Sequence, residues 1–384
     1  MSRYVKGNQV TLLRNGTDYF PALLAEIQAA RHEIHIQTYI YEADNIGRQV
    51  GDALILAAQR GVNVCLLMDG FGSKDLPSSY VQELEKGGVQ VLVFRPQISP
   101  WTFKSNRLRR LHRKVSVFDG RVAFVGGINI IDDLNVPGDN GPRIDYAVHI
   151  EGVMVSDILT RVQRLWRHTS WRHLQSTQHQ YQPVPMPPMP GNSMLAKYVV
   201  RDNILHRRDI EQMYMQGIRQ AKKDILIANA YFIPGVAFRN ALIDAAKRGV
   251  RVRLLLQGRR EHMLMIATHA LYSNFLRNDI EIYEYRKSFM HSKVAVIDGN
   301  WATVGSSNID PFSLLLSREA NVFVKNGKFA AELRGCIEQD IEYGAVQVLA
   351  RDWEHGHVLK RTVSWLVFIL VRFVLGLIGY PNRH

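Results

Sequence analysis

The sequence predicts an α/β protein of two similar domains, each a mixed β-sheet flanked by helices, in a pseudo-twofold arrangement. Three observations lead to this fold class: helical patterns alternate with short apolar strands, their order repeats along the chain, and one polar motif occurs twice. The chain has 384 residues, enough for two domains of ordinary size, and its 46% apolar residues can fill a substantial core.

An amphipathic helix followed by an apolar strand opens each half. The first helix begins at Thr17 and places Phe20, Leu23 and Ile27 on one face, and the strand IHIQTYIY follows. The second helix begins at Asp209 and precedes the strand ILIANAYF. The shared order indicates a duplicated unit.

The next elements also match between the halves. AAQRGVNVCLLMDG corresponds to AAKRGVRVRLLLQG, and each is typical of a helix end, a tight glycine turn and a buried strand. GGVQVLVF then corresponds to NDIEIYEY, which predicts one more strand in each half. A hairpin with an Asp-Gly turn closes each unit, in LHRKVSVFDG and in MHSKVAVIDGN.

Changes in composition divide the chain into four parts. The stretch QYQPVPMPPMPGNSM holds five prolines, which exclude a regular element. We therefore expect a first domain over residues 1–179, a proline-rich linker over 180–194 and a second domain over 195–355. The apolar stretch TVSWLVFILVRFVLGLIGY predicts a membrane-associating helix over 360–384.

The polar motif is H-x-K-x₄-D-x₆-G-[GS]-x-N, once in each half. Its members are His112, Lys114, Asp119 and Asn129 in the first copy, and His291, Lys293, Asp298 and Asn308 in the second. A single three-residue match could be an ordinary strand with polar flanks. Two copies with matching tails exceed what chance supplies, and a merely structural repeat would not need to keep these residue types.

Paired motifs in a pseudo-twofold arrangement predict one site, with one histidine facing the other across a phosphate. Phosphodiester exchange needs a nucleophile on one side of phosphorus and an acid for the leaving alcohol on the other, and two imidazoles can supply both. The two lysines would neutralise the non-bridging oxygens, and the two asparagines would donate hydrogen bonds. No carboxylate cluster has metal-ligand spacing, so we expect no metal and no cofactor.

Four acidic residues have distinct expected places. Asp145 and Glu319 each precede an apolar strand downstream of a motif, where each could orient an imidazole or could simply be a surface charge. Asp119 and Asp298 belong to the catalytic motifs, yet their Asp-Gly context favours turn stabilisation over contact with substrate.

Together with QTYIYEAD, LMDGFGS, FVGGIN, IANAYFIPG and WATVGSSNIDPFSLLLSREANV, the paired motifs resemble the phospholipase D superfamily and, within it, bacterial cardiolipin synthases of the short type. The resemblance covers roughly residues 8–350. It implies transfer of a phosphatidyl group from one phosphatidylglycerol to another through a phosphohistidine, with release of glycerol. It also implies that His112 is the nucleophile and His291 the general acid/base, because the N-terminal motif usually carries the nucleophile; the nearly symmetric sequence does not decide this.

The net charge of +13 points to an anionic partner, which could be nucleic acid, anionic lipid or a phosphorylated substrate. Trp101 and Phe103 lie among cations and suit either a membrane interface or stacking on nucleic acid. In the C-terminal stretch, Trp365, Phe368 and Arg372 share one helical face, and a charge at mid-membrane costs about 2.5–3.5 kcal/mol, which favours an interfacial helix over a membrane span. A buried core helix is the alternative.

We therefore expect an anionic phospholipid membrane and phosphatidylglycerol as partners, and no nucleic acid. The expected location is the cytoplasmic face of the bacterial inner membrane, as a peripheral or monotopic protein. The oligomeric state stays open. The alternatives are a phospholipase D-type hydrolase that uses water as acceptor, a nuclease of the same superfamily, and a non-catalytic membrane-binding protein.

Overall fold

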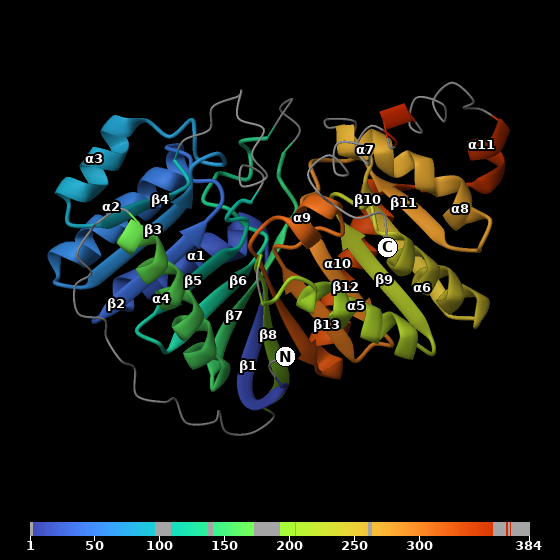
Figure 1. The fold of residues 1–384 in the computed structure, drawn as a ribbon, viewed down its shortest axis with the longest axis horizontal. Coiled ribbons are helices and arrows are strands. Elements are labelled where there is room, and N and C mark those ends of the chain that lie inside the picture. The colour runs from blue at the N-terminus through green and yellow to red at the C-terminus, as the bar shows by residue number, and fades with distance from the viewer. Residues whose placement is uncertain are drawn as a thin grey trace.

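The computed structural model describes residues 3–96, 109–136, 141–172, 193–203, 205–259 and 263–355, and the isolated residues 366, 367 and 369. Throughout this part of the chain the strands belong to one continuous 15-stranded sheet. Helices cover both of its faces, and the two halves of the chain lie side by side (Figure 1).

The elements of the two halves follow the same order. The first half comprises β1 (Val5–Arg14), α1 (Asn15–Ala29), β2 (Glu33–Thr38), α2 (Asn45–Gln59), β3 (Asn63–Asp69), α3 (Ser78–Lys86), β4 (Gln90–Phe94), β5 (Lys114–Phe118), β6 (Val122–Gly126), β7 (Tyr146–Gly152) and α4 (Met154–Arg172). The second half comprises β8 (Met194–Arg201), α5 (Asp209–Gln220), β9 (Asp224–Asn229), α6 (Val236–Lys247), β10 (Arg251–Gln257), α7 (Met263–Thr268), a 3₁₀ turn (His269–Leu271), α8 (Tyr272–Leu276), β11 (Glu281–Tyr285), β12 (Lys293–Ile297), β13 (Trp301–Gly305), α9 (Pro311–Leu315), β14 (Glu319–Lys325), α10 (Gly327–Gly344), β15 (Ala345–Val348) and α11 (Ala350–His355).

The strand order is the same on either side of the centre of the sheet. Strands β1 and β8 pair antiparallel at the centre. From β1 outward come β7, β6, β5, β2, β3 and β4, and from β8 outward come β14, β13, β12, β9, β10 and β11, with β15 added at that edge. In the first half β2, β3 and β4 run parallel to one another, and in the second half β9, β10 and β11 do the same. The strands between these and the centre of the sheet pair antiparallel, beginning with β5 on β2 and β12 on β9. The predicted pair of mixed sheets is therefore present, joined into one.

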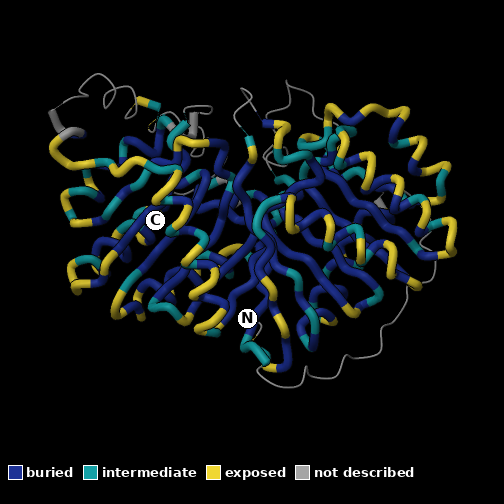
Figure 2. The backbone as a smooth tube through the Cα atoms, turned by 180° about the vertical axis from the view of Figure 1, so that it is seen from behind, coloured by how far each residue is buried: buried dark blue, intermediate teal, exposed yellow. Residues whose placement is uncertain are grey.

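Alternating side chains of the strands fill separate cores on the two faces of the sheet. In the first half, Ile34 and Phe118 pack with α1, α2 and α3, whereas Val115 and Val117 pack with α4 in a different cluster. In the second half α5, α6 and α8 cover one face and α10 the other. The strands are almost wholly buried and the outer faces of the helices are exposed (Figure 2).

Several element boundaries differ from the predicted ones; β2 and β9, for example, end at Thr38 and Asn229, three residues before the predicted strands end. Helix α1 begins at Asn15, earlier than predicted, whereas α5 begins at Asp209 as predicted. Met194 was placed in the linker by its prolines but begins β8, because its backbone pairs with Asn8 of β1. The rest of the expected linker, residues 180–192, lies outside the described residues.

The C-terminal helix expected over 360–384 also lies outside the described residues, apart from residues 366, 367 and 369. Of these, Val367 packs against the core of the second half, while Leu366 and Ile369 are exposed. Among the residues that the structure describes, no helix is both long enough and apolar enough to cross a bilayer.

Candidate active site

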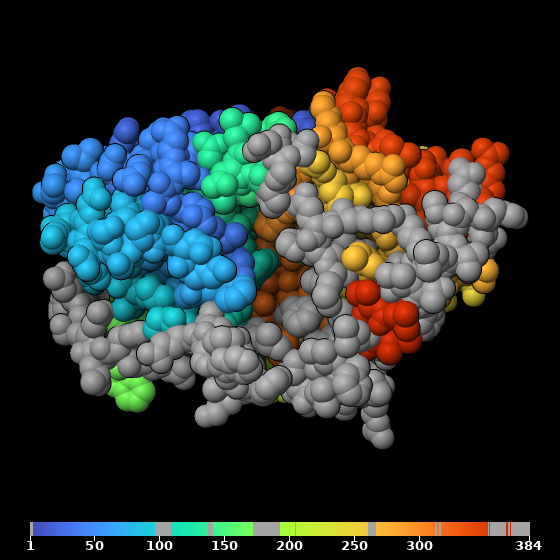
Figure 3. All heavy atoms as spheres, turned by 90° about the horizontal axis from the view of Figure 1, so that it is seen from above, coloured from blue at the N-terminus to red at the C-terminus, as the bar shows by residue number. Residues whose placement is uncertain are grey.

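Two short parallel bridges join the halves just before strands β5, β7, β12 and β14 begin, at the top of the sheet in Figure 1. The bridged pairs are Leu111 with Arg318 and Met290 with Ile144. Within them the backbone N–H of His112 donates to Arg318 (3.0 Å) and that of His291 donates to Ile144 (2.7 Å). Both motifs therefore start at the same end of the sheet. Seen from above, atoms of the first half and of the second half flank a hollow near the middle of this face (Figure 3).

Each histidine is hydrogen-bonded to a carboxylate of the other half. His112 Nδ1 lies 2.9 Å and 3.1 Å from the two carboxylate oxygens of Glu319, and His291 Nδ1 lies 2.7 Å from Oδ2 of Asp145. Glu319 is 0% exposed and Asp145 2% exposed, which excludes the alternative that they are surface charges. The structure thus brings together all four residues that the sequence proposed as two histidines and two orienting carboxylates.

The crossed pairs leave one nitrogen of each imidazole for chemistry. An ionised carboxylate can only accept, so Nδ1 carries the proton and Nε2 keeps its lone pair. Burial lowers the pKa of His112, although Glu319 opposes this, and burial together with both lysines lowers the pKa of His291 well below its ordinary value. Both imidazoles are therefore neutral near pH 7 in the absence of a bound anion.

Both motif lysines are buried close to the histidines. Lys114 is 3% and Lys293 0% exposed, and each ammonium donates to the backbone carbonyl of the histidine in its own motif. The Lys293 ammonium also lies 4.0 Å from Asp145. Burial lowers the pKa of Lys114 to about 7 and that of Lys293 to about 8. An anion between them would favour their charged forms, because opposite charge offsets the cost of desolvation.

The two motif asparagines are buried in the loops that follow β6 and β13. Asn129 Oδ1 accepts from the backbone N–H of Ile40 (3.0 Å), which leaves its amide nitrogen as a donor. Asn308 is 4% exposed, and its Oδ1 has no hydrogen-bond partner among the described residues. Their proposed contact with phosphate stays a prediction.

Asp119 and Asp298 lie at the opposite end of β5 and β12. Each motif lysine is the first residue of a five-residue strand and the aspartate follows its last residue, about 16 Å away along the sheet. Asp119 accepts from the backbone N–H groups of residues 31–33, and Asp298 from those of residues 222–224. Their place among the catalytic residues is therefore corrected: they hold the turn before β2 and β9, as the Asp-Gly context suggested.

Two aromatic side chains cover the histidines. The Tyr39 ring lies 4.8 Å from the His112 ring, and the Lys114 ammonium lies 5.1 Å from the centre of the Tyr39 ring. Phe289 stacks on His291 at 6.2 Å with an angle of 15° between the rings. In the second half the residue that matches Tyr39 is Ala230. The residue of the first half that matches Phe289 is Arg110, so the comparison of the two halves did not single out Phe289.

The Gly-Gly and Gly-Ser variants of the motif have a structural cause. The Ser306 hydroxyl donates to Glu319 at 2.5 Å, so the second copy uses its serine to hold the longer carboxylate. A Cβ at Gly127 would lie 2.2 Å from Oδ1 of Asp145, so the first copy has room for no side chain there. The sequence shows both variants but not the carboxylates that they contact.

The remaining predicted site residues cannot be placed. Trp101, Phe103, Trp365, Phe368 and Arg372 all lie outside the described residues. Within the described ranges, no three His, Cys, Asp or Glu side chains gather as metal ligands.

Comparisons with known proteins found a family model and several related sequences. A family model described as "Cardiolipin synthase, PLD-like domain" matches residues 23–134 and 214–341. The chain is 37% identical to cardiolipin synthase B of Shigella flexneri and of Escherichia coli K12, over 99% of this chain and 91% of theirs. It is 32% identical to the major cardiolipin synthase ClsA of Bacillus subtilis, over 94% of this chain and 73% of that one.

Solved structures share the fold at low sequence identity. Phosphatidylserine synthase of Haemophilus influenzae Rd KW20 superposes with a TM-score of 0.72 at 12% identity, over 98% of this chain and 96% of that one. Polyphosphate kinase of Porphyromonas gingivalis superposes with a TM-score of 0.60 at 12% identity, over 96% of this chain and 53% of that one. These two likenesses concern the fold alone.

Proposed function

The chain belongs to the cardiolipin synthase family of phospholipase D-like phosphatidyltransferases, and we propose that it joins two phosphatidylglycerol molecules into cardiolipin through a phosphohistidine. The observation that carries the proposal is the pair of crossed contacts, His112 with Glu319 and His291 with Asp145. It supplies two neutral imidazoles, each oriented from behind, beside two buried lysines. Two successive displacements at one phosphorus need a nucleophile, a group that donates and accepts a proton, and cations that stabilise the phosphate oxygens.

In the first step His112 Nε2 attacks the phosphorus of a donor phosphatidylglycerol. A nitrogen–phosphorus bond forms and the bond from phosphorus to the glycerol headgroup breaks. The departing oxygen takes a proton from Nε2 of His291, so His291 must first be protonated. The phosphate that enters with the substrate favours this protonation, and Asp145 stabilises the imidazolium through Nδ1.

In the second step His291 removes a proton from the headgroup hydroxyl of a second phosphatidylglycerol. That oxygen bonds to phosphorus, the nitrogen–phosphorus bond breaks, and His112 is regenerated. Lys114 and Lys293 stabilise the non-bridging oxygens throughout, with Asn129 and Asn308 as neutral donors. The scheme uses no metal or cofactor.

Glu319 has a role that matches its position behind the nucleophile. Attack turns His112 into a cationic phosphohistidine with its proton on Nδ1. The Glu319 carboxylate accepts that proton's hydrogen bond and neutralises the charge, while Ser306 keeps the carboxylate in place.

The reaction site is proposed to lie at the cytoplasmic face of the bacterial inner membrane, with the protein bound peripherally or monotopically. Its net charge of +13 supports this, because cationic surfaces are attracted to anionic lipid.

The test is mass spectrometry of lipids after the purified protein is incubated with phosphatidylglycerol vesicles in the presence of a chelator. Cardiolipin with free glycerol is the expected result. Phosphatidic acid alone would mean that water is the acceptor, and the proposal would then be wrong in favour of a hydrolase. Turnover only after metal is restored would contradict the metal-free scheme.

A further inference from the structure

The large apolar side chains that the described part of the chain exposes are unevenly distributed. We call the end of the sheet at which His112 and His291 lie the histidine end. Strands β3, β6 and β8 end there, and α4 and α10 return to it, where they contact Leu111 and the backbone of Arg286. Five of the exposed apolar side chains lie at this end: Phe71, Leu134, Trp171, Leu205 and Tyr343. The others are Leu56 near the opposite end, Val346 and Leu349 at the edge strand β15, and Leu366 and Ile369 in the C-terminal segment. Single exposed apolar residues are ordinary, whereas several at one end indicate a contact surface.

Phe71, which is 45% exposed, belongs to a loop that is fixed to the His112 side of the site. The carboxylate that ends β3, two residues earlier, accepts from the backbone N–H of Leu111 at 2.8 Å. The Ser73 hydroxyl donates to the backbone carbonyl of Tyr39 at 3.1 Å. Leu111 precedes His112 in the chain and the Tyr39 ring covers His112. The position of Phe71 is therefore tied to that of the proposed nucleophile.

Two cations flank the Phe71 ring. The Arg110 guanidinium lies 5.2 Å and the Lys74 ammonium 5.9 Å from the centre of the ring. Arg110 also lies 3.9 Å from the buried carboxylate of Asp69, and Lys74 lies 3.9 Å from the exposed carboxylate of Asp75. An exposed aromatic ring between cations is typical of a membrane interface, where the ring enters the acyl boundary and the cations meet lipid phosphates.

More arginines lie on the same side of the site. Arg95 and Arg318 lie 5.4 Å and 5.9 Å from the centre of the Phe94 ring. Burial lowers the pKa of Arg201 to about 10, and the charges of Arg318 and Arg109 add to this, although two nearby carboxylates oppose it. This side of the histidine end therefore suits an anionic partner. The exposed leucines at this end offer no ring on which a base could stack, which favours a lipid surface over nucleic acid.

The second half reverses the positions of ring and cation. Arg259 takes the place of Phe71 after the matching strand, and Phe289 takes the place of Arg110 before the motif. Phe289 is only 6% exposed, because it stacks on His291. Of these matched positions, the exposed ring is thus on the His112 side. In the proposed reaction this is the side that holds the phosphatidyl group with its two acyl chains.

We propose that the histidine end binds the surface of an anionic bilayer, with Phe71 inserted into it beside His112. The inference rests on the proposed function, which makes lipid the partner, and adds the orientation of the molecule. Both histidines then face the bilayer, and the acyl chains of the phosphatidyl group on His112 stay in the lipid while the headgroup is exchanged.

A fluorescent label at either end of the molecule tests the orientation directly. Phe71→Cys and Leu56→Cys each place a reactive thiol at an exposed position, in a Cys336→Ser background in which the remaining Cys65 is buried. Each variant is labelled with environment-sensitive nitrobenzoxadiazole and mixed with vesicles of phosphatidylcholine and phosphatidylglycerol. Emission from position 71 should shift to the blue and be quenched by spin-labelled lipid, whereas emission from position 56 should do neither.

Substitutions at the two ends measure what the contact contributes to binding. Phe71→Ala should weaken binding to these vesicles about tenfold, because the transfer of an aromatic ring from water into lipid is lost. Leu56→Ala should leave binding unchanged. Lys74→Glu should weaken binding about tenfold at low salt, because it changes two charges next to an anionic surface.

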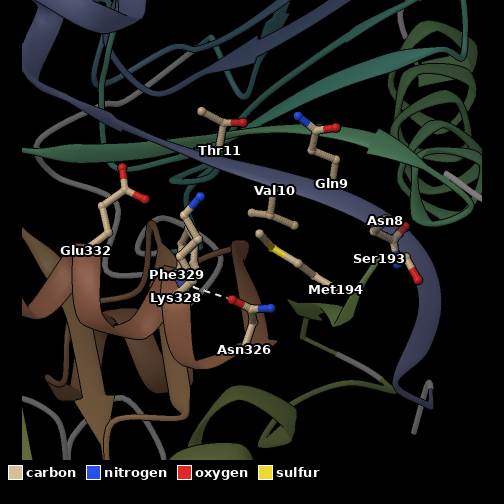
Figure 4. Close-up of a pocket in the computed structure, with 10 residues that line it drawn as sticks. All are labelled: Asn8, Gln9, Val10, Thr11, Ser193, Met194, Asn326, Lys328, Phe329 and Glu332. Carbon is tan, nitrogen blue, oxygen red and sulfur yellow. Dashed lines mark hydrogen bonds between the residues drawn. The ribbon is translucent and has the colours of Figure 1, made fainter. Parts of the chain in front are cut away.

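Lys328→Glu is the control for charge. Lys328 is also exposed and lines a cavity of about 430 Å³ between β1, β8 and the start of α10 (Figure 4). That cavity lies at the opposite end of the sheet, where β1 begins and β14 ends. Lys328→Glu therefore makes the same change in net charge far from the proposed contact, and screening by salt should leave vesicle binding unchanged.

Vesicle binding that Phe71→Ala and Lys74→Glu leave unchanged would overturn the inference, as would a membrane signal from position 56 instead of position 71. Loss of binding to a single-stranded oligonucleotide, and not to vesicles, in these variants would overturn it in favour of nucleic acid. None of these measurements uses turnover. A wild type that inserts position 71 but forms no cardiolipin would therefore overturn the proposed function and leave the membrane contact supported.

Discussion

Glu319, the first residue of β14, lies with a carboxylate oxygen 2.9 Å from Nδ1 of His112, which belongs to the other half of the chain. The reciprocal contact joins His291 to Asp145 at 2.7 Å. Neither motif is therefore complete within its own half. The bridges that pair the residue before each histidine with the residue before the opposite carboxylate enforce this exchange.

Replacing either histidine should abolish cardiolipin formation, because each displacement needs both. We expect His112→Ala and His291→Ala each to lower the rate by more than about 10³-fold. Rapid-quench trapping with an acyl-labelled phosphatidyl ester of p-nitrophenol, whose leaving group needs no acid, assigns the roles: label should accumulate on the His291→Ala protein and not on the His112→Ala protein. Label on His112→Ala instead would reverse the two assignments.

Replacing the carboxylates should slow different steps. Asp145→Asn and Glu319→Gln keep the side-chain shape but remove the charge that stabilises the imidazolium, and each should cost about 10²-fold in rate. Because the pairs are crossed, Asp145→Asn should impair proton transfer by His291 in both formation and breakdown of the phosphohistidine, whereas Glu319→Gln should impair mainly its formation. Pre-steady-state measurement of the intermediate distinguishes them. Identical kinetics in both variants would contradict separate roles for the two pairs.

The rate should depend on pH through Asp145 and the lysines. Burial raises the pKa of Asp145 from 3.8 to about 6, so kcat/KM should fall as the pH drops below about 6 and the carboxylate becomes protonated. The pKa values of Lys114 and Lys293, lowered to about 7 and about 8, predict a second fall at higher pH as the free enzyme loses the charges that bind phosphate. Asp145→Asn should lose the acidic limb and keep the alkaline one. An acidic limb that persists in Asp145→Asn would assign it to another group.

Gly127→Ala should damage the site more than a single methyl group suggests. The new Cβ would lie 2.2 Å from Oδ1 of Asp145 and push the carboxylate away from His291, at a cost of about 1–3 kcal/mol in the free energy of unfolding. We expect a loss of activity of at least about tenfold, measured beside thermal unfolding. Gly335→Ala is the control, because a Cβ there meets nothing within 4 Å. Full activity in Gly127→Ala would show that Asp145 can move without consequence.

Deleting residues 361–384 tests the expected C-terminal membrane contact. Cosedimentation with vesicles that contain phosphatidylglycerol should fall several-fold, because the segment contains the apolar stretch and its flanking cations. Cardiolipin formation on detergent-dispersed substrate should fall less, because His112, His291 and their partners lie outside the deleted segment. Unchanged vesicle binding would show that the C-terminal interpretation is wrong.

Much of the fold could be read from the sequence because its signals are local. Apolar periodicity and glycine turns indicated alternating helices and strands, and the repeat indicated two equivalent units. The boundary at Met194 was missed because pairing with β1, a distant strand, draws that residue into the sheet despite the prolines before it. Continuity of the two sheets through β1 and β8 likewise depends on a long-range pairing.

By itself the sequence determined which groups would do the chemistry. Two histidines, two lysines and two asparagines at matched spacing predict phosphodiester exchange, because residue type and spacing along a strand can be read directly from the sequence. Only the tertiary structure decided how these groups combine: Glu319 with His112, and Asp145 with His291. The physical reason is that such contacts join residues more than a hundred positions apart, and a nearly symmetric repeat offers each histidine two equivalent carboxylates. The bridges between Leu111 and Arg318 and between Met290 and Ile144 make the choice.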